Sequence, residues 1–518
     1  MSSLTRRSLL RTGLAGATVA ATAGFPVAST FARTRPTFPS APWALGVASG
    51  DPTSDGVVLW TRLATDALGV EPIAHDRILV RWELAEDEGF RRVARRGVAV
   101  ADRDAAHSVH VEVEGLRPHR DYWYRFAAGD EVSPVGRTRT APDPRNTPAA
   151  LAFAFASCQQ YEHGFFTAWR HVAEEDVDLV LHLGDYIYEH GTDVYKSADG
   201  NVRHHVGDEI TTLFDYRRRH AQYRSDGDLQ AAHAAHPFVV TWDDHEVDNN
   251  YADLVPEDGQ APEAFRARRA AAYQAYWEHM PLRRRQRAKG PDMRLDRTLD
   301  YGRLARFTVL DTRQYRSDQA CGDGTKAPCA EWEDPTRTFL GDDQERRVLR
   351  DLGRSGARWN VIANQVPLTA IDQKAGEGLT LYMDGWAGYP AARERFLSGI
   401  VDRRVGNPLV ITGDVHSNWA CEVNRDARDP ASTAVAVELI GTSITSTGDG
   451  NDSQPAQLAD NPQVKWYQRR RGYVRVAVDA REARADYRSL DYVSRPGAPV
   501  RTAKSFVVED GTPRLQPA

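Results

Sequence analysis

Five predicted strands in the second part of this chain each run directly into residues that can bind metal ions or transfer protons. These segments are residues 157–158, 184–188, 243–246, 364–365 and 413–416. In open α/β sheets, ligands gather outside the carboxyl ends of the strands, so the five segments can converge on one site. The chain must therefore fold so that these strand ends share one edge, which favours a layered α/β catalytic domain.

Apolar runs in this part alternate with helical and loop segments of varied length. We expect buried strands at residues 151–157, 177–183, 238–242, 304–310, 359–363, 408–412 and 434–439. Residues 216–224 and 262–279 are predicted helices, and the second opens on Pro262, which a first helical turn tolerates well. The catalytic domain is predicted over residues 150–518, with loops around 190–212 and 315–340 as active-site or surface insertions.

The first part of the chain has a shorter, alternating pattern. Strands are predicted at residues 57–62, 78–84, 108–113 and 122–126. The Leu116-Arg117-Pro118 turn that feeds the strand with Tyr122 resembles the tyrosine corner of immunoglobulin-like and fibronectin-like sandwiches. We therefore predict a small structural β-sandwich over residues 40–140, followed by a stiff proline-rich linker. A chain of 518 residues is long enough for both domains.

The extreme N-terminus has the features of an export signal. Arg6 and Arg7 form a twin-arginine pair, and a stretch of small residues over 13–28 follows, too short to span a membrane. This pattern predicts a Tat signal peptide over residues 1–32, with cleavage near Ala28 or Ala32; the alternative is a chance arginine pair. We expect a periplasmic or secreted monomer that engages the Tat export machinery, with no membrane-spanning segment.

Charge and cysteines narrow the class of protein further. The formal net charge is −6 with no basic stripe, so a nucleic-acid-binding domain is not expected. An acidic enzyme that binds phosphate needs local cations, which points to metals. Cys321 and Cys329 bracket a short polar loop, and in an exported protein this favours a disulfide over half of a zinc site, because no matching second pair exists.

The residue types at the strand ends suit a cluster of cations. Asp185 is the natural bridging carboxylate, and the Asp-x-His spacing of Asp414 and His416 offers two ligands from one turn. A thiolate at Cys158 and a phenolate at Tyr188 fit a strongly Lewis-acidic ion such as ferric iron better than magnesium. The plainer alternatives are a buried apolar cysteine and a packed tyrosine, but each residue lies beside another candidate ligand.

Taken together, these motifs resemble the PhoD family of alkaline phosphatases. Further segments of the resemblance are Asp384-Gly-Trp, Gly388-Tyr-Pro, Thr442-Ser-Ile-Thr-Ser and Gly448-Asp-Gly. The Trp-Asp-Asp-His-Glu string at 242–246 is the most specific element, and the resemblance extends over almost the whole chain. It implies a metallophosphoesterase-like αββα core after an immunoglobulin-like domain, with one Fe3+ and Ca2+ ions in the site.

The resemblance also implies roles for particular residues. The implied metal ligands are Cys158, Asp185, Tyr188, Asp244, Asn364, Asp414 and His416. Asp244 stands where ordinary metallophosphoesterases carry an asparagine ligand. A metal-bound hydroxide would attack phosphorus, while His245 donates a hydrogen bond or proton to the leaving oxygen. We expect a nearby carboxylate such as Glu246 to tune the pKa of this histidine. No Gly-x-Ser-x-Gly elbow stands at a strand end, so a serine nucleophile is not expected.

We therefore predict a secreted, metal-dependent alkaline phosphatase or phosphodiesterase that hydrolyses phosphate mono- or diesters. A phospholipase D-type hydrolase of choline phospholipids on the same fold is the first alternative, and the deciding loops lie near residues 190–212 and 440–455. A non-catalytic metal- or phosphate-binding protein is the alternative from another class, and the proton donor His245 argues against it. A redox protein that uses the iron fits the carboxylate-rich ligands least.

Overall fold

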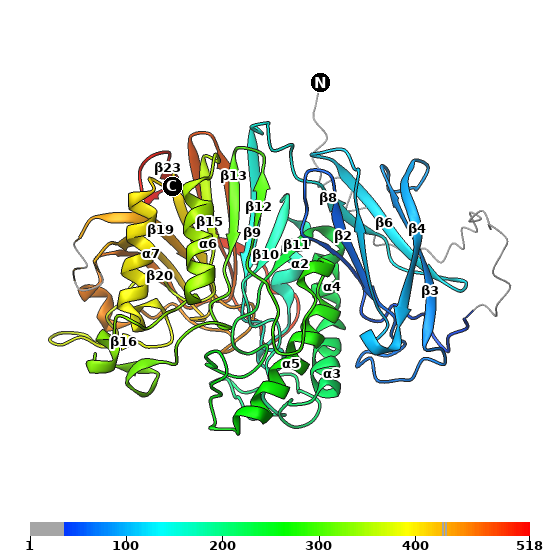
Figure 1. The fold of residues 1–518 in the computed structure, drawn as a ribbon, viewed down its shortest axis with the longest axis horizontal. Coiled ribbons are helices and arrows are strands. Elements are labelled where there is room, and N and C mark those ends of the chain that lie inside the picture. Colours follow the sequence, from blue (N-terminus) through cyan, green and yellow to red (C-terminus); the bar gives the residue numbers. More distant parts are fainter. Residues whose placement is uncertain (1–35, 427–428, 430–431) are drawn as a thin grey trace.

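Two large β-sheets face each other at the centre of the molecule, and helices cover the outer face of each (Figure 1). This computed structural model describes residues 36–426, 429 and 432–518, so the predicted Tat signal over residues 1–32 lies outside the described residues. Among the described residues, the strands form sheets of ten, seven, five and two strands. The αββα layering implied by the resemblance is confirmed.

The larger sheet draws strands from both ends of the chain. Its order is β24 (Gln516–Pro517), β23 (Val500–Glu509), β22 (Glu482–Leu490), β21 (Gly472–Asp479), β9 (Ala150–Ala156), β10 (Leu179–His182), β11 (Pro237–Val240), β1 (Val47–Gly50), β2 (Val57–Arg62) and β5 (Ser108–Val113). Because β9, β10 and β11 are parallel neighbours, their carboxyl ends lie at one edge of the sheet.

The second sheet lies opposite the first. Its order is β12 (Arg297–Tyr301), β13 (Ala305–Val309), β15 (Trp359–Ala363), β17 (Pro408–Thr412), β19 (Ala434–Ile440), β18 (Asn418–Asn424) and β20 (Val464–Gln468). Strands β13, β15, β17 and β19 are mutually parallel, so this sheet also gathers its carboxyl ends at one edge.

The alternation of large and small residues in β9 shows how the layers are built. Phe153 and Phe155 point into the core between the sheets, and Phe153 meets Phe307 of the facing sheet edge-to-face, with ring centroids 5.2 Å apart. Ala154 and Ala156 point to the other face, where their small size lets the helices approach. Burying each phenylalanine contributes about 1.5–3 kcal/mol.

The helices form the two outer layers. On the larger sheet lie α2 (Thr167–Glu174), α3 (Leu213–Arg224), α4 (Gly227–Ala235) and α5 (Pro262–His279), and on the second sheet lie α6 (Gly341–Gly353) and α7 (Pro390–Asp402) (Figure 1). Among these and the other described helices, none is both long and apolar enough to cross a membrane.

The N-terminal sandwich shares a sheet with the catalytic core. Strands β3 (Arg77–Ala85), β4 (Val93–Asp102), β6 (Asp121–Ala128), β7 (Glu131–Val132) and β8 (Gly136–Arg139) form a sheet that packs on β2 and β5. The Tyr122 hydroxyl accepts the backbone N–H of Arg117 at 2.9 Å, which is the predicted tyrosine corner. Strand β1 pairs in parallel with β11, so one sheet continues across the predicted boundary near residues 140–150.

The C-terminal region contains strands that we did not predict. The sequence interpretation ended its strands at residue 439, whereas β20 to β24 lie beyond it. Strand β21 pairs antiparallel with β9 and so sits within the larger sheet. The alternation of Val474, Val476 and Val478 with smaller or polar residues was the available signal, and it is typical of a strand.

Candidate metal centre and active site

The predicted site residues lie where parallel strands end. Cys158 follows β9, Asp185 follows β10, Asp244 follows β11, and Asp414 and His416 follow β17. Four of these residues have left-handed backbones, with φ of 56° at Cys158, 55° at Asp185, 67° at Asp414 and 50° at His416. This conformation costs about 1–3 kcal/mol for a non-glycine residue and is concentrated at functional sites. The strain is therefore evidence that these turns are shaped for function.

The glycines that precede two of these aspartates are required by packing. Gly184 has φ of 112°, and a Cβ atom there would lie 2.5 Å from the Cβ of Asp243. At Gly413 a Cβ would lie 2.3 Å from the Ser157 Oγ. Each glycine thus lets one strand end pass against another, which brings the donors of neighbouring strands together.

One group of donors gathers around the thiol. In the set Cys158, Asp185 and His416, every pair of donor atoms lies within 4.8 Å. The Tyr188 hydroxyl joins them, because it donates to Asp185 Oδ2 at 2.9 Å and lies 3.3 Å from His416 Nε2. The structure therefore brings the predicted thiol, carboxylate, imidazole and phenol into one cluster.

A second group shares one residue with the first. Donor atoms of Asp185, Asp244 and His245 also lie within 4.8 Å of one another. Because Asp185 belongs to both groups, it has the arrangement that a bridging carboxylate needs. Asp185 Oδ1 and Asp414 Oδ2 are buried without a hydrogen-bond partner, and such atoms in a native fold call for an ion or water. The donor set therefore fits a cluster of cations.

The electrostatics of the cluster agree with this fit. Burial, followed by the neighbouring charge of Asp185, raises the pKa of both Cys158 and Tyr188 well above their usual values. Burial likewise raises the pKa of Asp185 and Asp414 well above the usual carboxyl value. By themselves these groups prefer their protonated forms, and a bound cation would reverse that preference by supplying positive charge.

His245 is held by a carboxylate other than the one we expected. Its Nδ1 lies 2.7 Å from Glu189 Oε2, and its ring packs 4.1 Å from that of Tyr188. Burial would lower the pKa of His245, but the charge of Glu189 and of nearby aspartates raises it well above its usual value. Burial would raise the pKa of Glu189, but the charge of His245 lowers it to about 2. The ring is therefore a charged donor in this setting.

The expectation that Glu246 tunes His245 was wrong. Glu246 instead accepts the backbone N–H groups of Asp185 at 3.1 Å, Tyr186 at 2.6 Å and Asp243 at 2.8 Å. It thus fixes the two turns that carry the donors. Its position directly after His245 made it a plausible partner in the sequence, but the residue that reaches the ring comes from the end of a different strand.

Asn364 is engaged in the scaffold. Its Oδ1 accepts the indole N–H of Trp386 at 3.2 Å, and its Nδ2 donates to the carbonyl of Val366 at 2.5 Å. Asn364 is not among the described residues that line the cleft over the donor groups. Both polar atoms of the Asn364 amide thus have partners in the scaffold, and the role of Asn364 as a ligand stays a prediction.

Arg313 is a site residue that sequence reasoning missed. Its guanidinium is fully buried, lies 2.5 Å from Asp243 Oδ1 and 3.6 Å from Asp244 Oδ1, and makes a bidentate pair with Asp384 at 2.9 and 2.7 Å. Arg313 thereby fixes the Asp243-Asp244 turn through its ion pairs. The available signal was the Asp-Thr-Arg string after β13, a further polar strand end.

A cleft of about 640 Å³ opens over the donor groups. Asp185, Asp244, His245, Asp414 and His416 line its polar side, and Ile371, Tyr382, Trp419, Pro367 and Ala387 lie among its other walls. The two predicted insertion loops both reach it, through His190 and Tyr195 in one and Thr325 in the other. The cleft can thus take a polar group against the donors and a larger organic group beside it.

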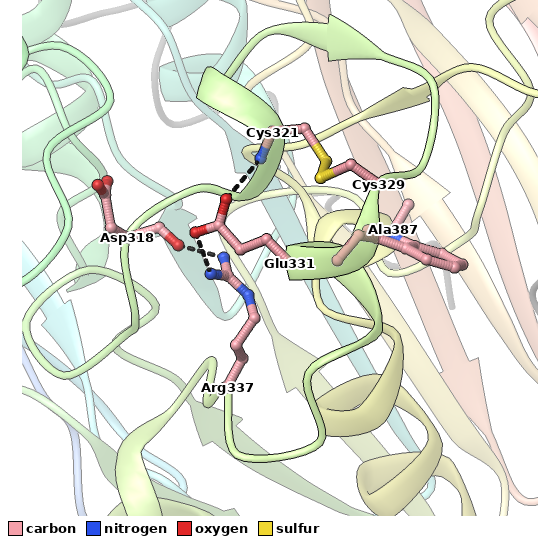
Figure 2. Close-up of a disulfide and its surroundings, with 7 residues drawn as sticks. Asp318, Cys321, Cys329, Glu331, Arg337 and Ala387 are labelled. Atoms are coloured by element: carbon pink, nitrogen blue, oxygen red, sulfur yellow. Dashed lines mark hydrogen bonds and ion pairs between the residues drawn. A yellow bond between two sulfur atoms is a disulfide. The ribbon is translucent and has the colours of Figure 1, made fainter.

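The disulfide predicted between Cys321 and Cys329 is confirmed, with Cα atoms 6.0 Å apart (Figure 2). The Cys321 N–H donates to Glu331 Oε2 at 3.0 Å, and the other Glu331 oxygen pairs with Arg337 at 3.1 Å (Figure 2). The closed loop contains β14 (Thr325–Lys326), which pairs with β16 (Leu381–Tyr382). This crosslink therefore braces the cleft wall that carries Thr325.

Two facing sheets with such a donor cluster at one edge define the class of metallophosphoesterase-like hydrolases. The chain belongs to the PhoD-like phosphatase family, which it matches over residues 153–487, and it matches the N-terminal domain of that family over residues 28–142. Alkaline phosphatase D of Bacillus subtilis (strain 168) is 52% identical over 477 residues, which are 92% of this chain and 82% of that protein. The solved structure of PhoD superposes with a TM-score of 0.91 at 51% identity, covering 93% of each chain.

Proposed function

We propose that this phosphoric ester hydrolase cleaves phosphate mono- and diesters at the edge where the two sheets gather their donors. The observation that carries the proposal is that Asp185 belongs to two donor groups, while His245, oriented by Glu189, belongs to the second and packs on Tyr188 beside the first. A binding protein has no need of an oriented proton donor at its cation cluster. Membership of a metal-dependent phosphatase family supports the same conclusion.

The donor types support a division of labour among the ions. Cys158, Asp185, Tyr188 and His416 would hold Fe3+, because thiolate, phenolate and imidazole suit a strongly Lewis-acidic ion. Asp244 and Asp414 offer oxygen donors on the neighbouring side, which suit Ca2+. When bound, these ions would collect the phosphoryl oxygens, stabilise the charge of the transition state and make water more acidic.

The chain itself supplies orientation and a proton. His245 Nδ1 is bonded to Glu189, so Nε2 is the ring nitrogen left for the substrate, and His245 lines the cleft. The charge of Glu189 raises the pKa of His245, which favours the protonated form that a general acid needs. Glu189 is itself fixed, because its Oε1 accepts the backbone N–H of Asn249 at 3.0 Å. His245 can therefore protonate the departing oxygen from one defined position.

Replacing His245 by Ala tests this role. We expect turnover on an alkyl phosphate to fall roughly 10²–10³-fold, because one donor to developing charge is lost. On nitrophenyl phosphate the loss should be smaller, since that leaving group departs without a proton. Metal content and thermal stability should stay near those of the wild type. Near-normal turnover on both substrates would remove His245 from the chemistry, and loss of metal would make it a ligand.

The kind of ester is tested with the same preparations. Parallel assays on a phosphomonoester, a phosphodiester and phosphatidylcholine separate phosphatase and phosphodiesterase activity from the phospholipase D-type alternative. We propose mono- and diesters because the polar side of the cleft holds the donors for phosphoryl oxygens. Preferential release of choline from phosphatidylcholine would favour the alternative.

We also propose export through the Tat pathway, on the basis of Arg6 and Arg7. Changing both to Lys should trap the unprocessed chain inside the cell, because the export machinery recognises the twin-arginine pair. Cell fractionation with antibody detection measures this. Normal export of the double variant would contradict the proposal.

A further inference from the structure

A loop over residues 190–212 leaves the metal edge and returns to it. Its two arms are paired, because the N–H of Thr192 donates to the carbonyl of Gly207 at 3.0 Å. His190 and Tyr195 of this loop line the cleft. The position of the loop therefore sets part of the cleft wall, and what fixes the loop matters for the site.

The loop folds around one buried carboxylate. Glu162, in the short helix η2 (Tyr161–His163), has no exposed surface. Its Oε1 accepts the backbone N–H groups of Asp193 and His205, each at 2.9 Å, and its carbonyl accepts the N–H of Val202 at 2.8 Å. Both arms of the loop thus contact this residue.

The second oxygen of Glu162 is buried and lacks a hydrogen-bond partner. The nitrogen that approaches it is His205 Nδ1, at 3.5 Å. In the part of the chain that the structure describes, no lysine or arginine forms an ion pair with Glu162. A buried carboxylate oxygen without a hydrogen-bond partner is costly.

Two side chains of the loop complete a set of donors around Glu162. In the trio Glu162, Asp193 and His204, every pair of donor atoms lies within 4.8 Å. His204 Nδ1 lies 3.1 Å from Asp193 Oδ1, and these side chains are 61% and 42% exposed, respectively. Glu162 is thus the buried member of the trio. The partly exposed side chains of Asp193 and His204 leave room for water molecules as further ligands.

We propose that a divalent cation binds Glu162, Asp193 and His204 at a site separate from the catalytic centre and clamps this loop. Two carboxylates neutralise the ion, and an imidazole beside them suits Mn2+ or Zn2+ better than Ca2+, which takes oxygen ligands. The ion gives the second oxygen of Glu162 the partner that it lacks. Because it joins η2 to both arms of the loop, it holds Tyr195 and His190 against the cleft. None of the proposed catalytic roles is needed for this inference.

Mn2+ titration of the purified holoenzyme tests the site. The wild type should bind about one more Mn2+ per chain than the Asp193→Asn/His204→Ala variant, because two of three protein ligands are lost. In the wild type, Mn2+ should slow trypsin cleavage after Lys196, an exposed residue of the loop, roughly tenfold, because a clamped loop opens less often. The variant should be cut at the same rate with and without Mn2+.

Two further variants keep the test decisive. Asp208→Asn removes an exposed carboxylate of the same loop outside the trio, and it should behave as the wild type. His204→Ala alone changes a largely exposed side chain, so it should fold normally and still weaken Mn2+ binding. Equal Mn2+ binding by the wild type and the double variant, or trypsin cleavage indifferent to Mn2+, would overturn the proposal. Iron and calcium analysis should be unchanged throughout, and loss of either ion from the double variant would count against a separate site.

Discussion

The sandwich and the metal edge of the catalytic sheets differ in how their buried carboxylates are paired. In the sandwich, the Tyr122 hydroxyl accepts the Arg117 N–H, and the buried Glu83 pairs with Arg125 at 2.8 Å. At the metal edge, oxygens of Asp185 and Asp414 have no hydrogen-bond partner. Buried polar groups with hydrogen-bond partners stabilise the fold, whereas carboxylate oxygens without such partners remain able to bind a cation. The difference separates a structural region from a functional one.

The comparison extends to the backbone. The proposed ligands Cys158, Asp185, Asp414 and His416 lie in left-handed turns, and Glu246 fixes two of the turns at the edge through their N–H groups. Regular pairing with β3 and β8 places the sandwich strand with Tyr122, and the left-handed His119 lies in the turn before that strand. The folding free energy of the whole molecule thus offsets the local backbone strain at the metal edge.

The largest expected effect comes from Asp185→Asn, which removes the charge shared by both donor groups. Turnover should fall about a thousandfold or more, together with metal content, because the bridging carboxylate is lost. The thermal stability of the metal-free protein should be unchanged or higher, because a buried charge without a partner disappears. Steady-state kinetics, metal analysis and calorimetry measure this.

Glu83→Gln is the matched change in the sandwich. It should leave turnover unchanged and cost about 1–3 kcal/mol of stability, because Arg125 loses the charge of Glu83. If Asp185→Asn kept its turnover, or if Glu83→Gln lost it, the division between the two regions would be broken.

A second prediction concerns the join between the regions. His110 of β5 packs on Trp277 of α5 with ring centroids 4.1 Å apart, and its Nε2 lies 2.9 Å from the Trp277 carbonyl. Burial lowers the pKa of His110 to about 4, below its unfolded value of about 6.5. Its neutral form therefore stabilises the fold above the unfolded pKa, and this contribution is lost as the pH falls through the folded pKa.

His110→Gln removes that titration. Between about pH 7 and pH 4, the wild type should lose about 3 kcal/mol more of its free energy of unfolding than the variant does. Urea unfolding at both pH values measures the difference. Equal losses in both proteins would show that protonation of His110 does not destabilise the contact between the sandwich and α5.

The smallest expected effect on stability comes from deleting one tyrosine hydroxyl in each region. Tyr122→Phe should cost about 1 kcal/mol of stability, because one hydrogen bond is lost, and should leave turnover unchanged. Tyr188→Phe should change stability little but remove or shift a visible absorption band, because a phenolate bound to Fe3+ is coloured. Absorption spectra and thermal melts of both variants measure this. A colourless, iron-free wild type with full activity would contradict the proposed metal.

Local patterns in the sequence predicted the elements well. The helix predicted at residues 262–279 coincides with α5, and the strands predicted at 359–363 and 408–412 coincide with β15 and β17. Periodicity and flanking turns are local properties, so they can be seen without the fold. The position of polar residues at strand ends predicted the region of the site for the same reason.

Pairings between distant segments could not be seen in this way. Strand β21 lies beside β9, although more than half of the chain separates them. The partner of His245 is Glu189, from the end of another strand, and the cation behind Asp243 is Arg313, from the facing sheet. Such partners depend on which strand ends meet in three dimensions.

The sequence by itself thus determined many of the strands before residue 440, the tyrosine corner, the disulfide pair and the residue types that gather at the metal edge. Only the tertiary structure decided which donors share a cluster, that Asn364 is engaged by Trp386, and that Glu162 lies beneath the 190–212 loop with one unpaired oxygen. The physical reason is that secondary structure follows from local periodicity, whereas the partner of a buried charge is chosen by packing between elements that are far apart in the chain.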